Sequence, residues 1–207
     1  MTRLSFLLLS LFCVSSLLAG TPEAELEQWL QAKKKLGDVQ VTLQMTRTLP
    51  TLKEPTVRAG QLFHLQDGRF RMELGSPVTT TLLFDGTQLH LLEASAKKWR
   101  SMASTSPSAK MWLMMLQPEQ LTAERLTEDF TTTLTSQAGD ASTITFLPKS
   151  SSLRKRLTQM DVQLQKPGPR LTKLRMIQGD NSSTVLAFEP PQSIPPATLA
   201  QLKFTPP

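Results

Sequence analysis

The sequence predicts an α+β fold in which an incomplete, strongly curved antiparallel β-barrel of about ten strands is closed by two or three helices acting as a lid. Short apolar runs are separated by Asp67-Gly68, Gly75-Ser76-Pro77 and Asp85-Gly86, and such turn residues favour tight hairpins. Residues 82–84 and 89–92 are apolar at almost every position, whereas a sheet covered on one side alternates apolar and polar residues. Both faces should therefore contact apolar material: protein on one side, and protein or ligand on the other.

The N-terminus predicts export. Residues 1–20 have the pattern of a signal peptide, with Arg3 at the start, an apolar run from Leu4 to Leu18 and small residues at Ala19-Gly20. An uncleaved N-terminal helix is the alternative, although the run is short for a membrane span. Cys13, the only cysteine, lies within this segment, so residues 21–207 would form one cysteine-free, periplasmic domain without disulfides.

The first elements of this domain are a helix and a half-buried strand. Thr21 can cap a helix over residues 23–36, and Pro22 suits its first position. Residues 39–46 alternate strictly between apolar and polar side chains, which predicts a strand with one buried face. The antiparallel meander over residues 60–92 follows.

The remainder predicts a loop, helices and further strands. Residues 94–107 are polar and indicate a loop, while residues 111–116 are all apolar and favour a short helix that Pro118 ends. A second helix is expected over residues 118–126. The prolines at 190–191 and 195–196 predict an extended, rigid stretch before the last strand. Strands are expected at residues 130–134, 142–147, 157–165, 171–177, 184–188 and 202–204.

Few residues could support catalysis. His64 and His90 lie on different predicted strands, and Asp67 and Asp85 each precede a glycine, so turn formation accounts for both carboxylates. The chain has no nucleophile elbow, paired-histidine zinc motif, phosphate-binding loop or dinucleotide fingerprint. The sequence therefore argues against an enzyme and predicts neither a cofactor nor a metal site.

The formal net charge is +6, with basic residues grouped at 33–35, 97–100 and 154–156. Such groups can favour nucleic acid, anionic lipid headgroups or an acidic protein partner. Export argues against nucleic acid. Solvated surface charge and docking to a membrane or partner both remain open.

The apolar run from Met111 to Leu116 contains three methionines and a tryptophan. One interpretation is a buried helix packed on the sheet. The other is a mobile lid over a lipid cavity, because methionine is unbranched and polarisable and adapts to variable apolar shapes.

The meander resembles the periplasmic outer-membrane lipoprotein carrier family (LolA-like). The residues that carry the resemblance are Gly60, Phe70-Arg71-Met72-Glu73, Pro77, Asp85-Gly86 and the closing segment Phe204-Thr205-Pro206-Pro207. The chain departs from the family pattern at Leu65-Gln66-Asp67, where many members have Arg-Pro, at Met72, where an aromatic is expected, and at His90, where Trp or Phe is common. These departures bear on the identity of the cargo and leave an apolar cavity intact.

The resemblance implies that residues 21–207 form a half-barrel whose cavity takes acyl groups under two lid helices, Leu26 to Leu36 and Met111 to Leu116. Arg71 is a candidate lid lock, through Glu73 or a lid carbonyl. The candidate lipid-binding residues are Val41, Leu43, Met45, Phe63, Phe70, Met72, Leu82, Phe84, Leu91, Met111, Trp112, Met114 and Met115.

The resemblance also implies a function. A monomeric, non-catalytic periplasmic carrier would take lipoproteins from an inner-membrane ABC-type lipoprotein-releasing complex and pass them to an outer-membrane acceptor. Two alternatives stay open: a carrier of free lipid or glycolipid in the envelope, and a periplasmic sensor of lipid or lipoprotein.

Overall fold

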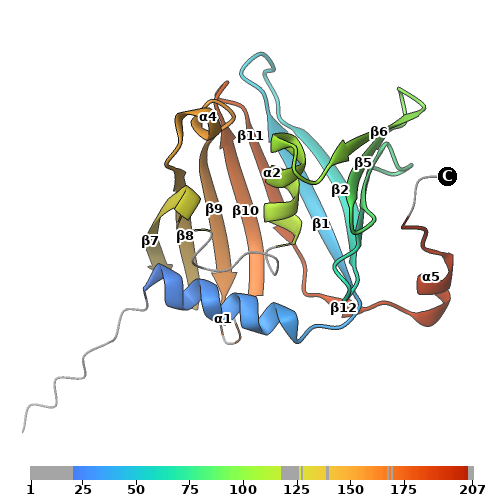
Figure 1. Cartoon of the computed structure of the whole chain (residues 1–207), viewed down its shortest axis with the longest axis horizontal. Helices are drawn as coiled ribbons and strands as arrows, with labels where there is room; N and C mark the ends of the chain where they lie inside the picture. Colours follow the sequence, from blue (N-terminus) through green and yellow to red (C-terminus); the bar gives the residue numbers. More distant parts are fainter. Residues whose placement is uncertain are drawn as a thin grey trace, which may run out of the picture.

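A single antiparallel sheet organises the molecule. The computed structural model describes residues 21–117, 126, 128–138, 140–166, 168 and 170–204. Within these residues, twelve strands run in the order β6-β5-β4-β3-β2-β1-β11-β10-β9-β8-β7, with β12 paired to β1. Edge strands β6 and β7 do not pair with each other, so the sheet is curved but open (Figure 1). The predicted fold class is therefore confirmed.

The strand bounds follow the turn signals closely in the first half of the chain. Register shifts in the β9–β10 and β7–β8 pairs mark irregularities of the kind that bend a sheet. The strands are β1 (Val39–Thr48), β2 (Thr56–His64), β3 (Phe70–Leu74), β4 (Thr80–Phe84), β5 (Gln88–Glu93), β6 (Lys98–Ala103), β7 (Phe130–Ala138), β8 (Ala141–Pro148), β9 (Leu157–Gln165), β10 (Arg170–Gln178), β11 (Ser183–Phe188) and β12 (Gln192–Ser193).

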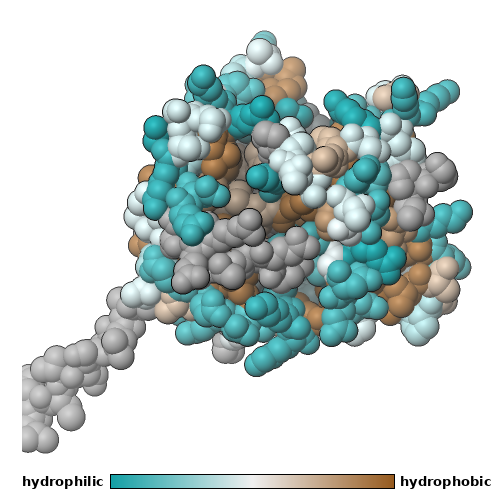
Figure 2. Space-filling model, viewed as in Figure 1, coloured by the Kyte–Doolittle hydropathy of each residue, from teal (hydrophilic) through white to brown (hydrophobic). Residues whose placement is uncertain are grey.

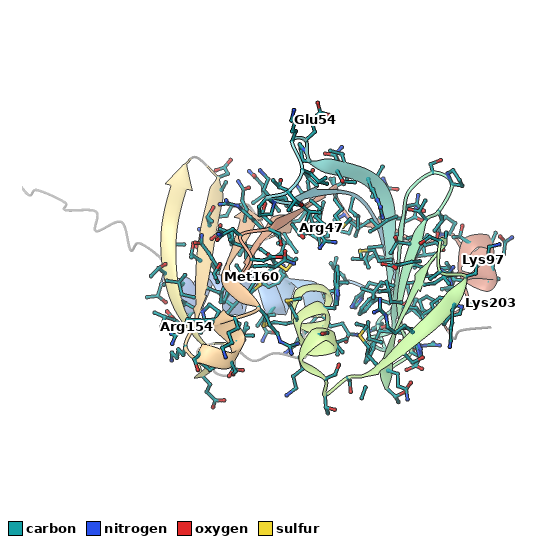
Figure 3. All side chains as sticks on the ribbon, turned by 90° about the horizontal axis from the view of Figure 1, so that it is seen from above. Arg47, Glu54, Lys97, Arg154, Met160 and Lys203 are labelled. Carbon is teal, nitrogen blue, oxygen red and sulfur yellow. The ribbon has the colours of Figure 1, made fainter. Side chains whose placement is uncertain are left out.

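Two helices cover the concave face. Helix α1 (Pro22–Lys34) begins as predicted, because the Ala24 amide donates to Thr21 Oγ1 at 3.2 Å. Helix α2 (Pro107–Leu116) contains the predicted apolar run and starts after Ser106, which caps the Ala109 amide. Seen from above, the sheet curves around α2 (Figure 3). None of the helices in the described residues is long and apolar enough to cross a membrane.

The convex face is covered by the C-terminal segment, which includes helix α5 (Pro196–Gln201). Its outer cluster consists of Phe63, Leu65, Leu83, Ile194 and Phe204, with Trp99, Leu199 and Leu202 packed against it. The chain itself thus supplies the apolar partner of the second face. The inner cluster, between the concave face and helices α1 and α2, is larger and forms the main core.

Three predictions of elements were wrong. Residues 98–103 form strand β6 instead of loop, because an edge strand tolerates polar residues that hide its pattern. Residues 202–204 form no strand, and Pro196 starts helix α5, a position that its fixed φ suits as well as an extended segment. The short helix α4 (Ser151–Arg154) was not predicted. The signal peptide and most of the helix predicted at 118–126 lie outside the described residues.

Candidate functional site

A cavity of about 290 Å³ lies between the C-terminal half of α1 and the middle of the sheet. Figure 2 shows hydrophobic residues in the recess on this face, surrounded by hydrophilic residues. Most of the lining is apolar. The lining residues are Trp29, Ala32, Lys33, Leu36, Val39, Val41, Leu62, His64, Leu116, Gly168, Arg170, Leu171, Phe188, Glu189 and Pro191.

Strand register builds the floor of this cavity. Val41 lies opposite Leu62 in the β1–β2 pair, while Leu43 lies opposite both Gly60 and Phe188 of β11. Side chains directly opposite each other in an antiparallel pair project from the same face. The three central strands therefore present a continuous apolar surface to α1.

The N-terminal half of α1 is fixed to the sheet by polar contacts. Thr132 Oγ1 donates to Glu23 Oε1 at 2.8 Å, and Lys166 Nζ forms an ion pair with Glu25. Glu25 is only 3% exposed, and its other oxygen accepts a bond from Ser142 Oγ at 3.4 Å. Because a buried carboxylate is costly without its partner, these contacts hold this end of α1 in place.

The C-terminal half of α1 instead covers the cavity and contacts α2. Lys33 Nζ donates to the Leu116 carbonyl at 3.0 Å, linking the last turns of the two helices. The negative end of the α2 dipole favours a cation at this position. Leu36, which follows the helix, remains 40% exposed at the cavity.

A second void lies beyond the first. It measures about 10 Å³ and is bordered by Met114 of α2 and by Met160 and Leu174 of the sheet, among others. Met160, labelled in Figure 3, lies on the inner side of the sheet. Trp29 and Leu171 border both spaces, so these two side chains form the partition between the cavity and the void.

The structure places most predicted lipid-binding residues on the concave face, but few at the cavity. Only Val41 lines the cavity itself, and Met114 borders the small void. The other predicted residues that belong to the inner cluster are Leu43, Met45, Phe70, Met72, Leu82, Phe84, Leu91, Met111 and Trp112. The side chain of Met115 lies outside the description.

Phe63 is the exception, since it belongs to the outer cluster. In the apolar run Leu62-Phe63, alternation along β2 turns Leu62 inward and Phe63 outward, and the sequence did not indicate which was which. Trp29, Leu171 and Phe188 line the cavity and were not predicted. The apolar face of helix 23–36 could have indicated Trp29.

Arg71 lies on the convex face and does not contact the lid helices. It aligns with Phe63 and Leu83 across neighbouring strands. Its Nε lies 2.6 Å from Glu73 Oε1, and its Nη1 donates to the Lys203 carbonyl at 2.9 Å. The expected Glu73 contact is present, but Arg71 fastens the C-terminal segment rather than α1 or α2.

Asp85, His90 and Ser101 form a hydrogen-bonded chain near the outer face. His90 Nε2 lies 2.9 Å from Asp85 Oδ2, and His90 Nδ1 lies 2.8 Å from Ser101 Oγ. Burial raises the pKa of Asp85, but bonds from the Gln88 amide, His90 and Thr87 outweigh it and lower this pKa far below the ordinary value. Asp85 thus accepts the hydrogen bonds that form its own hairpin turn, as predicted. Ser101 does not line either of the two cavities described above. Among the described residues, no group of three potential metal ligands occurs.

Comparison with known proteins adds a family match. Residues 39–205 match the family described as "Outer membrane lipoprotein carrier protein LolA". Among solved structures, the LolA superfamily protein NE2245 from Nitrosomonas europaea is 13% identical with a TM-score of 0.43, over 91% of this chain and 99% of that one. Lipoprotein LppX from Mycobacterium tuberculosis is 14% identical (TM-score 0.43, 81% and 93% covered). The Pseudomonas aeruginosa MucA/MucB complex is 12% identical (TM-score 0.44, 86% and 60% covered). No curated protein sequence matches the chain.

Proposed function

The chain belongs to the outer membrane lipoprotein carrier (LolA) family, and we propose that it is a periplasmic carrier of lipoproteins. It would bind their acyl chains in the apolar cavity and move them from the inner to the outer membrane. The observation that supports this function is the cavity under α1, whose walls are apolar strands on one side and helix α1 on the other.

The energetics of the cavity suit reversible transport. Each buried methylene contributes about 0.8 kcal/mol, so an acyl chain supplies a large favourable term. The cavity of about 290 Å³ lies at the small end of ligand sites, which span about 300–1,000 Å³. A whole acyl chain therefore requires Trp29, Leu171 or the end of α1 to move, and the free energy of that movement offsets part of the binding energy.

The partners and compartment belong to the same proposal. Cleavage after residue 20 would release a monomeric periplasmic domain, residues 21–207. An inner-membrane ABC-type lipoprotein-releasing complex would be the donor, and an outer-membrane acceptor would receive the cargo. Release would follow from a better acceptor site, because the cavity itself favours the acyl chain.

A carrier of free lipid is the second candidate. The charged groups Lys33, Arg170 and Glu189 at an otherwise apolar cavity favour it, since the acyl chains of a lipoprotein need no charged neighbours.

Native mass spectrometry of the protein purified from the periplasm tests the proposal. Val41→Glu places a charge in the cavity, while the matched control Val57→Glu changes a side chain that is 54% exposed in β2. We expect a bound lipoprotein with wild type and the control, and its loss with Val41→Glu. Free lipid alone would favour the second candidate. A protein that is empty and takes up neither lipoprotein nor lipid would contradict both.

A further inference from the structure

The ionisable side chains that line the cavity include more cations than anions. Four of its lining residues have ionisable side chains: Lys33, His64, Arg170 and Glu189. Two of them are cationic at neutral pH and one is anionic. His64 is buried at the floor of the cavity, within strand β2.

Arg170 is the most informative of these groups. It is the first residue of β10, and its side chain is partly buried at the cavity. Within the described part of the chain, its guanidinium has neither an ion pair nor a hydrogen bond, although the Glu189 carboxylate lines the same cavity. A partly buried guanidinium in an apolar surrounding gains more from an anion than an exposed one does, because the local dielectric is lower.

Several lysines near Arg170 add to the positive charge at this end of the cavity. Lys33 lines the cavity and donates to the Leu116 carbonyl, while Lys34 and Lys35 are exposed at the same end of α1. Lys166, in the turn before Arg170, is already paired with Glu25. Among the residues that line the cavity, cationic side chains therefore outnumber anionic ones by two, Lys33 and Arg170, to one, Glu189.

We propose that the cavity takes a single-chain anionic lipid, whose acyl chain lies between α1 and the central strands and whose carboxylate or phosphate headgroup binds Arg170, assisted by Lys33. This proposal rests on the second candidate function, a carrier of free lipid, and narrows the cargo of that carrier. A guanidinium binds both headgroup types in a bidentate manner, and such charge-assisted bonds are about twice as strong as neutral ones. The apolar lining supplies affinity for the chain, and the cations select the headgroup.

The size of the cavity favours one acyl chain over several. Its volume of about 290 Å³ leaves room for only part of a chain before Trp29 or Leu171 moves. Gly168, which is exposed, also lines the cavity and precedes Arg170 by two residues, so we expect a headgroup at Arg170 to stay next to the outside of the molecule.

The test compares two ligands with the same chain. Palmitate carries a carboxylate and monopalmitoylglycerol is neutral, and both are titrated by calorimetry below their micelle concentrations at pH 8. We expect wild type to bind palmitate more tightly by about tenfold, equivalent to about 1.4 kcal/mol. Arg170→Gln should remove most of this preference and leave the affinity for monopalmitoylglycerol unchanged.

A control variant, a second cavity variant and a competitor accompany the test. Arg175→Gln removes an arginine from the same strand, where it is paired at 3.7 Å with Asp161, and should leave the preference intact. Glu189→Gln removes the carboxylate at the cavity and should increase the affinity for palmitate. Inorganic phosphate at the same concentration should not displace palmitate.

Several results would overturn the proposal. Equal affinity for both ligands, together with no effect of Arg170→Gln, would show that the headgroup is not recognised while leaving the carrier function standing. Displacement by inorganic phosphate would indicate an anion site unrelated to lipid. A protein that binds lipoprotein but neither ligand would reject the single-chain cargo, and one that binds no acylated molecule would reject the carrier function as well.

Discussion

Replacing Trp29 with alanine should join the cavity and the small void behind it. Trp29 is 6% exposed and borders both spaces. Truncating a buried tryptophan costs about 3–5 kcal/mol. We expect about 3 kcal/mol for Trp29→Ala, because its indole already borders unfilled space. Urea unfolding of the ligand-free variant measures this loss of stability.

The same change should alter the preference for chain length. Stearate has two more methylenes than palmitate, and burying both contributes about 1.6 kcal/mol, more than tenfold in Kd. We expect calorimetry to show this gain in Trp29→Ala and a smaller one in wild type, where the partition blocks the chain. Trp99→Ala is the control, since Trp99 packs on the outer cluster and should reduce stability without affecting chain-length preference. An unchanged preference in Trp29→Ala would refute the assignment of Trp29 as the partition.

Three further predictions concern the contacts that hold the fold. Lys166→Gln leaves the buried Glu25 carboxylate without its ion pair, and should lower the free energy of unfolding by about 1–3 kcal/mol, because Lys166 is itself partly exposed; an unchanged urea midpoint would contradict this. Asp85→Asn should destabilise the protein at pH 7. Since the pKa of Asp85 is lowered on folding, the difference from wild type should persist above about pH 4 and shrink as the pH falls further; a difference that is constant from pH 7 to 3 would refute it. Arg71→Ala removes the bond to the Lys203 carbonyl and should speed proteolysis in residues 196–204 without changing lipid affinity, whereas a loss of affinity would favour a lid-locking role.

Local signals predicted the elements well where one face of the sheet was distinguishable. Helix α1 followed from Thr21 and Pro22, and strand β1 from strict alternation, because caps and period-two patterns depend on neighbouring residues alone. The order of β1 beside β11 could not be predicted, since it joins residues more than a hundred positions apart.

The site was harder to predict because its walls come from distant segments. Leu171 and Phe188 belong to strands in the second half of the chain, and the sequence does not show that they meet α1. Phe63 was assigned to the wrong face of the sheet. When consecutive residues of a strand are all apolar, the sequence does not show which of them point to the concave face. Only the position of α5 on the convex face resolves the ambiguity.

The C-terminal segment covers part of the apolar surface of the convex face. Phe63 and Leu83 are apolar residues of the convex face, and the chain itself covers them through Phe204 and its neighbours. The two-sided apolar strands consequently do not require ligand on both faces. Among the described residues, the mostly apolar cavity of about 290 Å³ is on the concave face. A cleft of about 620 Å³ beside the C-terminal segment has a more polar lining that includes Asp38, Asp67 and Arg69.

A carrier needs a wall that moves without unfolding the sheet, and α1 has the required asymmetry. Its first turns are held by the buried Glu25 and by Glu23, whereas its last turn is linked to α2 through the Lys33 bond to the Leu116 carbonyl. A hydrogen bond from a charged donor to a neutral acceptor contributes about 1.5–3 kcal/mol to stability. Burying two to four methylenes contributes a comparable free energy. An entering acyl chain can therefore offset the loss of that bond, while the contacts of Glu25 keep the helix attached at its other end.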